Sequence, residues 1–140
     1  MNCLNPIVLL ILTVTSLSAQ TVKLKKQIVY IDDAATFSFA KKAMGNELYV
    51  YNLNTKEELV NMIVDNNKTE SKVDDSKKIV FTKLNTIIQS KNFRGRDWEF
   101  MLALLLSEKV FDLKGEINLE NLKRFTAKYD DRNINHTMMR

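Results

Sequence analysis

The hydrophobic pattern of this chain changes its period once, and that change limits the folds the chain can adopt. From residue 22 to residue 88, apolar residues mostly alternate with polar ones or form short runs rich in Val, Ile, Leu and Tyr, which is typical of β-strands. From residue 97 to residue 129, apolar residues recur at helical spacing. Strands that precede helices predict an α+β fold: an antiparallel meander of about five strands, followed by two C-terminal helices packed on one face.

The strand half divides at polar turn signals. Asp32-Asp33, Gly45-Asn46 and Asn54-Thr55 separate the first four segments, and a bulge is expected near Asn85 within the fifth. Residues 57–62 could also begin a helix, but a strand is preferred because the run is short and β-branched residues cluster at its end. Residues 65–78 are polar and predict a loop. The expected strands are 22–31, 35–39, 47–53, 59–64 and 79–88.

The helical half contains two expected helices. Residues 97–109 are apolar nearly all round, so this helix should be the most buried element, and Asp97 suits its N-terminal end electrostatically. Asn118 is typical of an N-cap for the second helix, whose apolar residues Leu119, Leu122, Phe125 and Tyr129 follow helical spacing. Residues 130–140 are expected to form a frayed tail.

The first 19 residues resemble a removable signal peptide. Residues 7–12 are an unbroken apolar run, and Ser16-Leu17-Ser18-Ala19-Gln20 has the small residues of a cleavage site. The first six residues lack Lys and Arg, so an uncleaved membrane anchor is the alternative. We expect a signal peptide over 1–19, one domain over 20–130 and a tail over 131–140. The mature chain would be secreted or periplasmic, and would meet the membrane only transiently through its leader.

Cleavage of the leader would remove the cysteine of the chain and leave its net charge unchanged. Cys3 is the only cysteine and would leave with the leader, so no disulfide, thiolate metal site or thiol nucleophile is expected. All charged residues follow Ala19, so the mature domain keeps the net charge of +4. This charge permits attraction to anionic surfaces, but nucleic acid is not an expected partner of an exported protein.

The sequence contains few of the residues and motifs that enzymes use for catalysis. His136 is the only histidine and lies in the polar tail, and no metalloprotease, nucleophile-elbow or phosphate-loop motif is present. The carboxylate doublets at 32–33, 74–75 and 130–131 are interpreted as turn or loop residues, because neighbours on an extended chain point to opposite sides. No catalytic residue, cofactor or metal is expected.

A basic and aromatic segment over residues 91–98 is the most distinctive local feature. Arginine side chains just before a helix start are what an anion site uses, so Lys91, Arg94, Arg96 and Trp98 are the candidate contacts for an anion or a partner. The alternative is structural: Phe93 and Trp98 anchor the helix while the arginines are solvated. A second basic set, which would protect a sheet edge, comprises Lys23, Lys25, Lys41 and Lys42.

The layout of the chain resembles that of small uncharacterised secreted proteins of Bacteroidetes and flavobacteria. The resembling residues are 17–20 at the end of the leader, 22–26 running into 28–32, and 107–110 through 128–130. The resemblance implies export and a single domain; that group has no assigned activity, so no site residues follow from it.

Three functions remain as expectations. The first is a non-catalytic envelope or secreted module that binds an unknown protein or envelope partner or has a structural role. The second is a binder of an anionic ligand or surface through residues 91–98. The third is a hydrolase that gathers distant carboxylates in a cleft.

Overall fold

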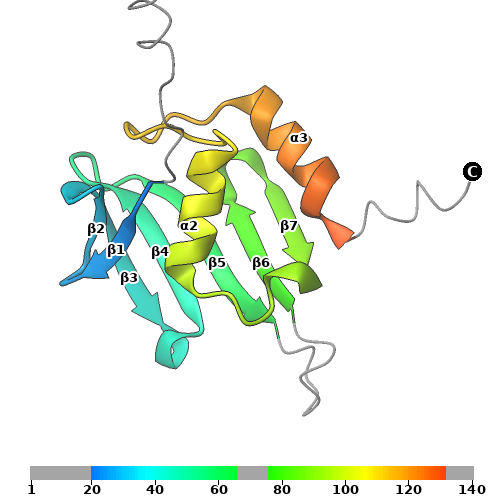
Figure 1. Ribbon diagram of the computed structural model, residues 1–140, viewed down its shortest axis with the longest axis horizontal. Helices are drawn as coiled ribbons and strands as arrows, with labels where there is room; N and C mark the ends of the chain where they lie inside the picture. The colour runs from blue at the N-terminus through cyan, green and yellow to red at the C-terminus, as the bar shows by residue number, and fades with distance from the viewer. Residues whose placement is uncertain (1–19, 66–75, 132–140) are drawn as a thin grey trace, which may run out of the picture.

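Seven antiparallel strands form one sheet, and their order in the sheet is their order in the chain (Figure 1). The computed structural model describes residues 20–65 and 76–131. Strands that are neighbours in the sheet are also consecutive in the chain, an arrangement that antiparallel pairing permits. The elements are β1 (Val22–Lys25), β2 (Ile28–Ile31), β3 (Ala34–Lys42), β4 (Glu47–Asn52), β5 (Glu58–Asp65), β6 (Ser76–Phe81), β7 (Thr86–Ser90), α2 (Trp98–Ser107) and α3 (Leu119–Tyr129).

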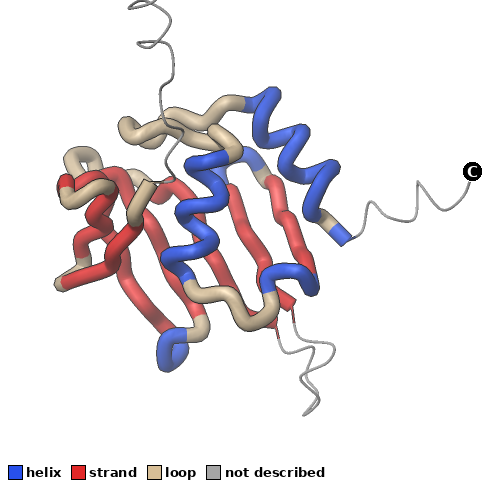
Figure 2. Tube along the Cα trace, viewed as in Figure 1, coloured by secondary structure: helices blue, strands red, loops and turns tan. Residues whose placement is uncertain are grey.

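The α+β class is confirmed, with strands first and two helices last (Figure 2), but five strands is too few. The expected strand 22–31 is two strands, because Lys26 and Gln27 take positive φ values of 51° and 66° and form a two-residue hairpin turn. The expected strand 79–88 is also two strands. A 3-10 turn over Thr82–Leu84 and a left-handed Asn85 replace the expected bulge.

The turn at Lys26-Gln27 changes which side chains share a face. In one continuous strand Val22, Leu24, Ile28 and Tyr30 would lie together, but the hairpin pairs Leu24 with Val29 and Lys25 with Ile28. Val22 and Leu24 therefore pack against the core, whereas Ile28 and Tyr30 lie on the opposite face, beside the lysines of β1.

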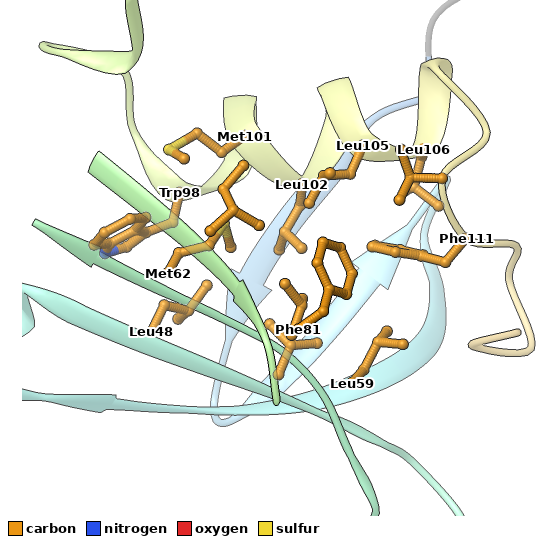
Figure 3. Close-up of a cluster of buried hydrophobic side chains, with 14 of the residues drawn as sticks. Leu48, Leu59, Met62, Phe81, Trp98, Met101, Leu102, Leu105, Leu106 and Phe111 are labelled. Carbon is orange, nitrogen blue, oxygen red and sulfur yellow. The ribbon is translucent and has the colours of Figure 1, made fainter. Parts of the chain in front are cut away.

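One face of the sheet and helix α2 make most of the core (Figure 3). Met101, Leu102 and Leu105 of α2 are buried, as expected for a helix that is apolar nearly all round. Asp97 is its N-cap and accepts a hydrogen bond from the Phe100 backbone N–H at 2.7 Å. The buried sheet residues beneath include Val29, Phe37, Leu48, Val50, Val60, Met62, Ile79, Phe81 and Ile88.

Helix α3 lies beside β7 and closes the other end of the core (Figure 1). Asn118 is its N-cap, as predicted, and accepts from the Asn121 backbone N–H at 3.0 Å. Phe125 packs between Phe93, with ring centroids 6.4 Å apart, and Tyr129, at 4.6 Å. The connection from α2 to α3 is fixed by Phe111, whose ring meets Phe37 edge-on at 5.7 Å.

Several local predictions can be compared with the structure directly. The strand expected over 59–64 is confirmed as β5, and the Asp32-Asp33 turn is confirmed by φ values of 51° and 68°. The loop expected over 65–78 is wrong at its ends, because Asp65 belongs to β5 and residues 76–78 to β6. The leader with Cys3, the doublet at 74–75 and His136 lie outside the described residues. No helix in the described ranges has the length and apolar character needed to cross a membrane.

Candidate functional site

The sheet face turned away from α2 and α3 is covered by neither helix. Its side chains alternate along each strand with those of the core, and none of them belongs to the hydrophobic cluster. In the described part of the chain, no helix packs against it. We call this surface the open face; its central residues are Ile28, Tyr30, Ser38, Ala40, Tyr49, Tyr51, Asn61, Ile63, Val80 and Ile87.

Strand pairing arranges the open face in rows with an uncharged centre and a charged rim. One row runs Ala40–Tyr49–Asn61–Val80–Ile87 across five strands, and the next runs Ile28–Ser38–Tyr51–Glu58. An aromatic, charge-poor centre inside a polar rim is the usual anatomy of a protein interface. The rim consists of Lys23, Lys25, Lys42, Glu47, Glu58, Asp65 and Lys78.

Tyr49 is held at the centre of the open face by two charged neighbours. Its hydroxyl donates to Glu47 Oε1 at 2.7 Å, and Lys42 Nζ lies 4.4 Å from the centre of its ring. The hydrogen bond to Glu47, then partial burial, then the negative charges of Glu47 and Glu58 raise the pKa of Tyr49 above its ordinary 10.0. The ring is therefore fixed and neutral at physiological pH, as a rigid contact surface requires.

Asn61 is the buried polar residue of the open face. Its amide nitrogen donates to Glu58 Oε1 and, at 3.5 Å, to Thr82 Oγ1. Its Oδ1 accepts no hydrogen bond from any described residue. Because a buried polar atom without a partner costs free energy, this oxygen opposes the stability gained from the two bonds of the amide nitrogen.

Replacing Tyr49 by Phe should lower the free energy of unfolding by about 0.5–1 kcal/mol, because the bond to Glu47 is lost. The raised pKa means that this contribution is present below pH 10.0 and is lost as the pH rises through the folded-state pKa. The difference between the two proteins should therefore be constant near neutrality and shrink above pH 10.0. Urea unfolding at several pH values measures it; a difference that grew with alkalinity would contradict the assignment.

The segment 91–98 is divided between the core and the surface. Trp98 is buried, and its indole N–H donates to the Gly45 carbonyl at 3.1 Å. The Arg96 guanidinium lies 4.6 Å from the centre of the Phe100 ring. Lys91 and Arg94 are exposed at this end of the sheet. Trp98 thus has the anchoring role that was the structural alternative, and the other three remain candidates for an anion contact.

Lys77 of β6 joins this segment, although no local pattern in the sequence indicated it. Its ammonium lies 5.2 Å from the centre of the Trp98 ring and donates to the Arg96 carbonyl. Burial lowers the pKa of Lys77, and the nearby Asp97 charge opposes that shift. Asp97 also accepts a hydrogen bond from the first turn of α2. A carboxylate already present at the helix start makes this end a weaker anion site than its arginines suggest.

The β7 edge of the sheet is closed by the carboxylate doublet at 130–131. The backbone N–H of Gln89 donates to Asp130 Oδ1 at 3.3 Å, and that of Lys91 donates to Asp131 Oδ2 at 2.8 Å. Asp130 is buried, so the first residues of the segment expected to be a frayed tail are instead fixed to the sheet.

The β1 edge carries Lys23 and Lys25, which agrees with edge protection. Lys41 and Lys42 lie at the end of β3 in the sheet interior, so edge protection does not apply to them. Charged side chains at one edge and a carboxylate cap at the other leave both edges poorly suited to the addition of a strand.

A pocket of about 520 Å³ lies at the connection between the helices, beside Gln20 and Phe111. Asp112, one of its polar side chains, is engaged within the loop: its Oδ1 accepts from the backbone N–H groups of Lys114 and Glu116, both at 2.9 Å. No group of three His, Cys, Asp or Glu residues that could hold a metal ion occurs among residues 20–65 and 76–131.

The chain matches no protein-family model, no curated protein and no solved structure.

Proposed function

We propose that this chain is an exported, non-catalytic binding module that contacts its partner through the open face. The observation that carries the proposal is the half-covered sheet: helices bury one face, and the other presents tyrosines and aliphatic residues within a charged rim. Exposed apolar surface rimmed by polar residues is characteristic of interaction sites.

Two further features support a binding role for the face. Tyr49 is fixed by Glu47 and Lys42, and a fixed aromatic ring loses little conformational entropy when it is covered. Both sheet edges are occupied or charged, so a partner finds its largest apolar contact on the face. The leader expected over 1–19 supports a partner in the envelope or outside the cell.

Site-specific photo-crosslinking in the native host tests the proposal. The full 140-residue chain would carry a photoreactive amino acid in place of Tyr51, at the centre of the open face, or in place of Leu119 on α3. Leu119 is the matched control because it is apolar and 63% exposed but lies in the helical layer. We expect a discrete covalent adduct from position 51 and none from position 119.

The same cultures test export. Intact-mass spectrometry of the protein from the cell-envelope and medium fractions should give the mass of a chain that begins at Gln20, or that mass less one ammonia where the N-terminal glutamine has cyclised. Protein that began at Met1 and stayed in the cytoplasm would remove the exported part of the proposal. The absence of any adduct from position 51 would remove the binding part.

A further inference from the structure

We infer, on the basis of the binding role proposed above for the open face, that its partner is a second copy of this chain. The two copies would stack face to face as a twofold dimer, with the helices of both copies outside. Sheets pack in this way at a separation of about 10 Å, and twofold dimers are the commonest closed assemblies.

The twofold axis of the dimer would run along β4. β4 is the middle strand of seven and carries Tyr49 and Tyr51 on the open face. A twofold axis along β4 places these two tyrosines against the same residues of the second copy. It likewise places Glu47 against Glu47, and Lys42 of each copy lies beside these carboxylates. The axis also lays β3 of each copy over β5 of the other, because these strands flank β4 on opposite sides.

The charges of the exchanged strands are complementary. On the open face β3 carries only a positive charge, Lys42, whereas β5 carries only negative ones, Glu58 and Asp65. Lys42 and Asp65 both lie at the end of the sheet where β4 begins. An axis along β4 keeps that level in both copies. It lays Lys42 of one copy over Ile63 of the other, one row from Asp65. The Asp65 carboxylate also pairs with Lys78 of its own copy at 3.4 Å.

The size of the open face suits a stable dimer. Its central strands β3 to β6 have six to nine residues. Seven strands spaced at about 4.8 Å, with roughly 20 Å of length each, cover roughly 700 Å². A standard interface buries about 800 Å² per partner, so one whole face provides an area of this class. The closed edges of β1 and β7 disfavour the competing edge-to-edge dimer.

Light scattering after size-exclusion chromatography of the exported protein, produced from the full chain, tests the dimer. We expect twice the mass of one chain at micromolar concentration. Tyr51→Arg should yield the mass of one chain, because two arginines would meet at the axis, whereas Leu119→Arg should remain dimeric. Circular dichroism and thermal unfolding of the monomeric Tyr51→Arg protein would show that it is folded.

An exchange of charges tests the predicted strand contact. Lys42→Glu should weaken dimerisation at least tenfold, because it places a carboxylate at position 42 one row from Asp65 of the second copy. Adding Asp65→Lys to Lys42→Glu, together with Lys78→Asp to keep the ion pair that residues 65 and 78 form within one copy, should restore most of the affinity. A wild-type monomer at high micromolar concentration, an unaffected Tyr51→Arg dimer or a charge exchange that does not restore binding would each overturn the inference.

The crosslinking experiment separates this inference from the proposed function. A position-51 adduct of twice the chain mass supports both. An adduct with a different protein supports the binding role of the open face and overturns the dimer, and no adduct overturns both.

Discussion

Replacing Phe111 by Ala is expected to lower the free energy of unfolding by about 3–5 kcal/mol. Phe111 is 2% exposed, and its ring meets Phe37 edge-on at 5.7 Å. Figure 3 shows the ring beside Leu106 and over the sheet, where the chain leaves α2. Truncation would leave a cavity where Phe111, in the connection between the helices, packs against Phe37 of β3. Domains of this size are stable by about 5–15 kcal/mol, so the loss is a large fraction of the total.

Leu113→Ala is the matched control for Phe111→Ala. Leu113 lies a short way further along the same connection but is 49% exposed, so its truncation should change the stability by about 0.5 kcal/mol or less. Urea unfolding followed by far-ultraviolet circular dichroism measures both variants. Equal losses in the two variants would show that Phe111 does not anchor the connection.

The helices and their starts could be predicted from the sequence because their signals are local. Asp97 and Asn118 each cap the helix that follows, and both accept from a backbone N–H three residues on. The apolar character of 97–109 likewise indicated the buried position of α2. Each inference needed only residues within a few turns of one another.

The number of strands could not be predicted, because a hairpin turn can form without the residues that usually mark turns. Lys26 and Gln27 form the turn with positive φ values, although neither is one of the residues, such as Gly or Asn, that usually adopt them. Strand pairing supplies the stabilisation that these conformations require, and pairing is not a local property. The membership of the open face depends on the same turn, since it moves Ile28 and Tyr30 away from the core.

The open face could not be predicted from the sequence either, because its residues are not contiguous in the chain. The segment 91–98 stands out in the sequence because its charges and rings are contiguous. The residues that define its environment, Lys77 and the Gly45 carbonyl, come from distant elements. The open face has no contiguous signal at all: it collects alternate residues of neighbouring strands, and its membership can be assigned only when the register is known.

Replacing Asp130 and Asp131 by Ala together should lower the free energy of unfolding by about 2–3 kcal/mol. Hydrogen bonds to charged groups contribute about 1.5–3 kcal/mol each. The long 3.3 Å bond of Asp130 and the partial exposure of Asp131 place the pair at or just below the lower end of the combined range. The double variant removes the acceptors for the Gln89 and Lys91 backbone N–H groups and so uncovers the β7 edge. Uncovered edges pair with other chains, so aggregation should increase with concentration.

Hydrogen exchange distinguishes this edge cap from a general loss of stability. The amides of Gln89 and Lys91 should exchange faster in the double variant than in the wild type, by more than the change in global stability accounts for. Asp33→Asn is the control, because Asp33 belongs to another carboxylate doublet, its side chain is 82% exposed, and its ion pair with Lys23 at 3.3 Å lies on the surface. Asparagine also tolerates the positive φ of 68° at this position. The control variant should alter neither the two amides nor the stability by more than about 0.5 kcal/mol. If the two amides kept their wild-type rates in the double variant, the carboxylates would not be the groups that close the edge, and the face-to-face dimer would lose one of its arguments.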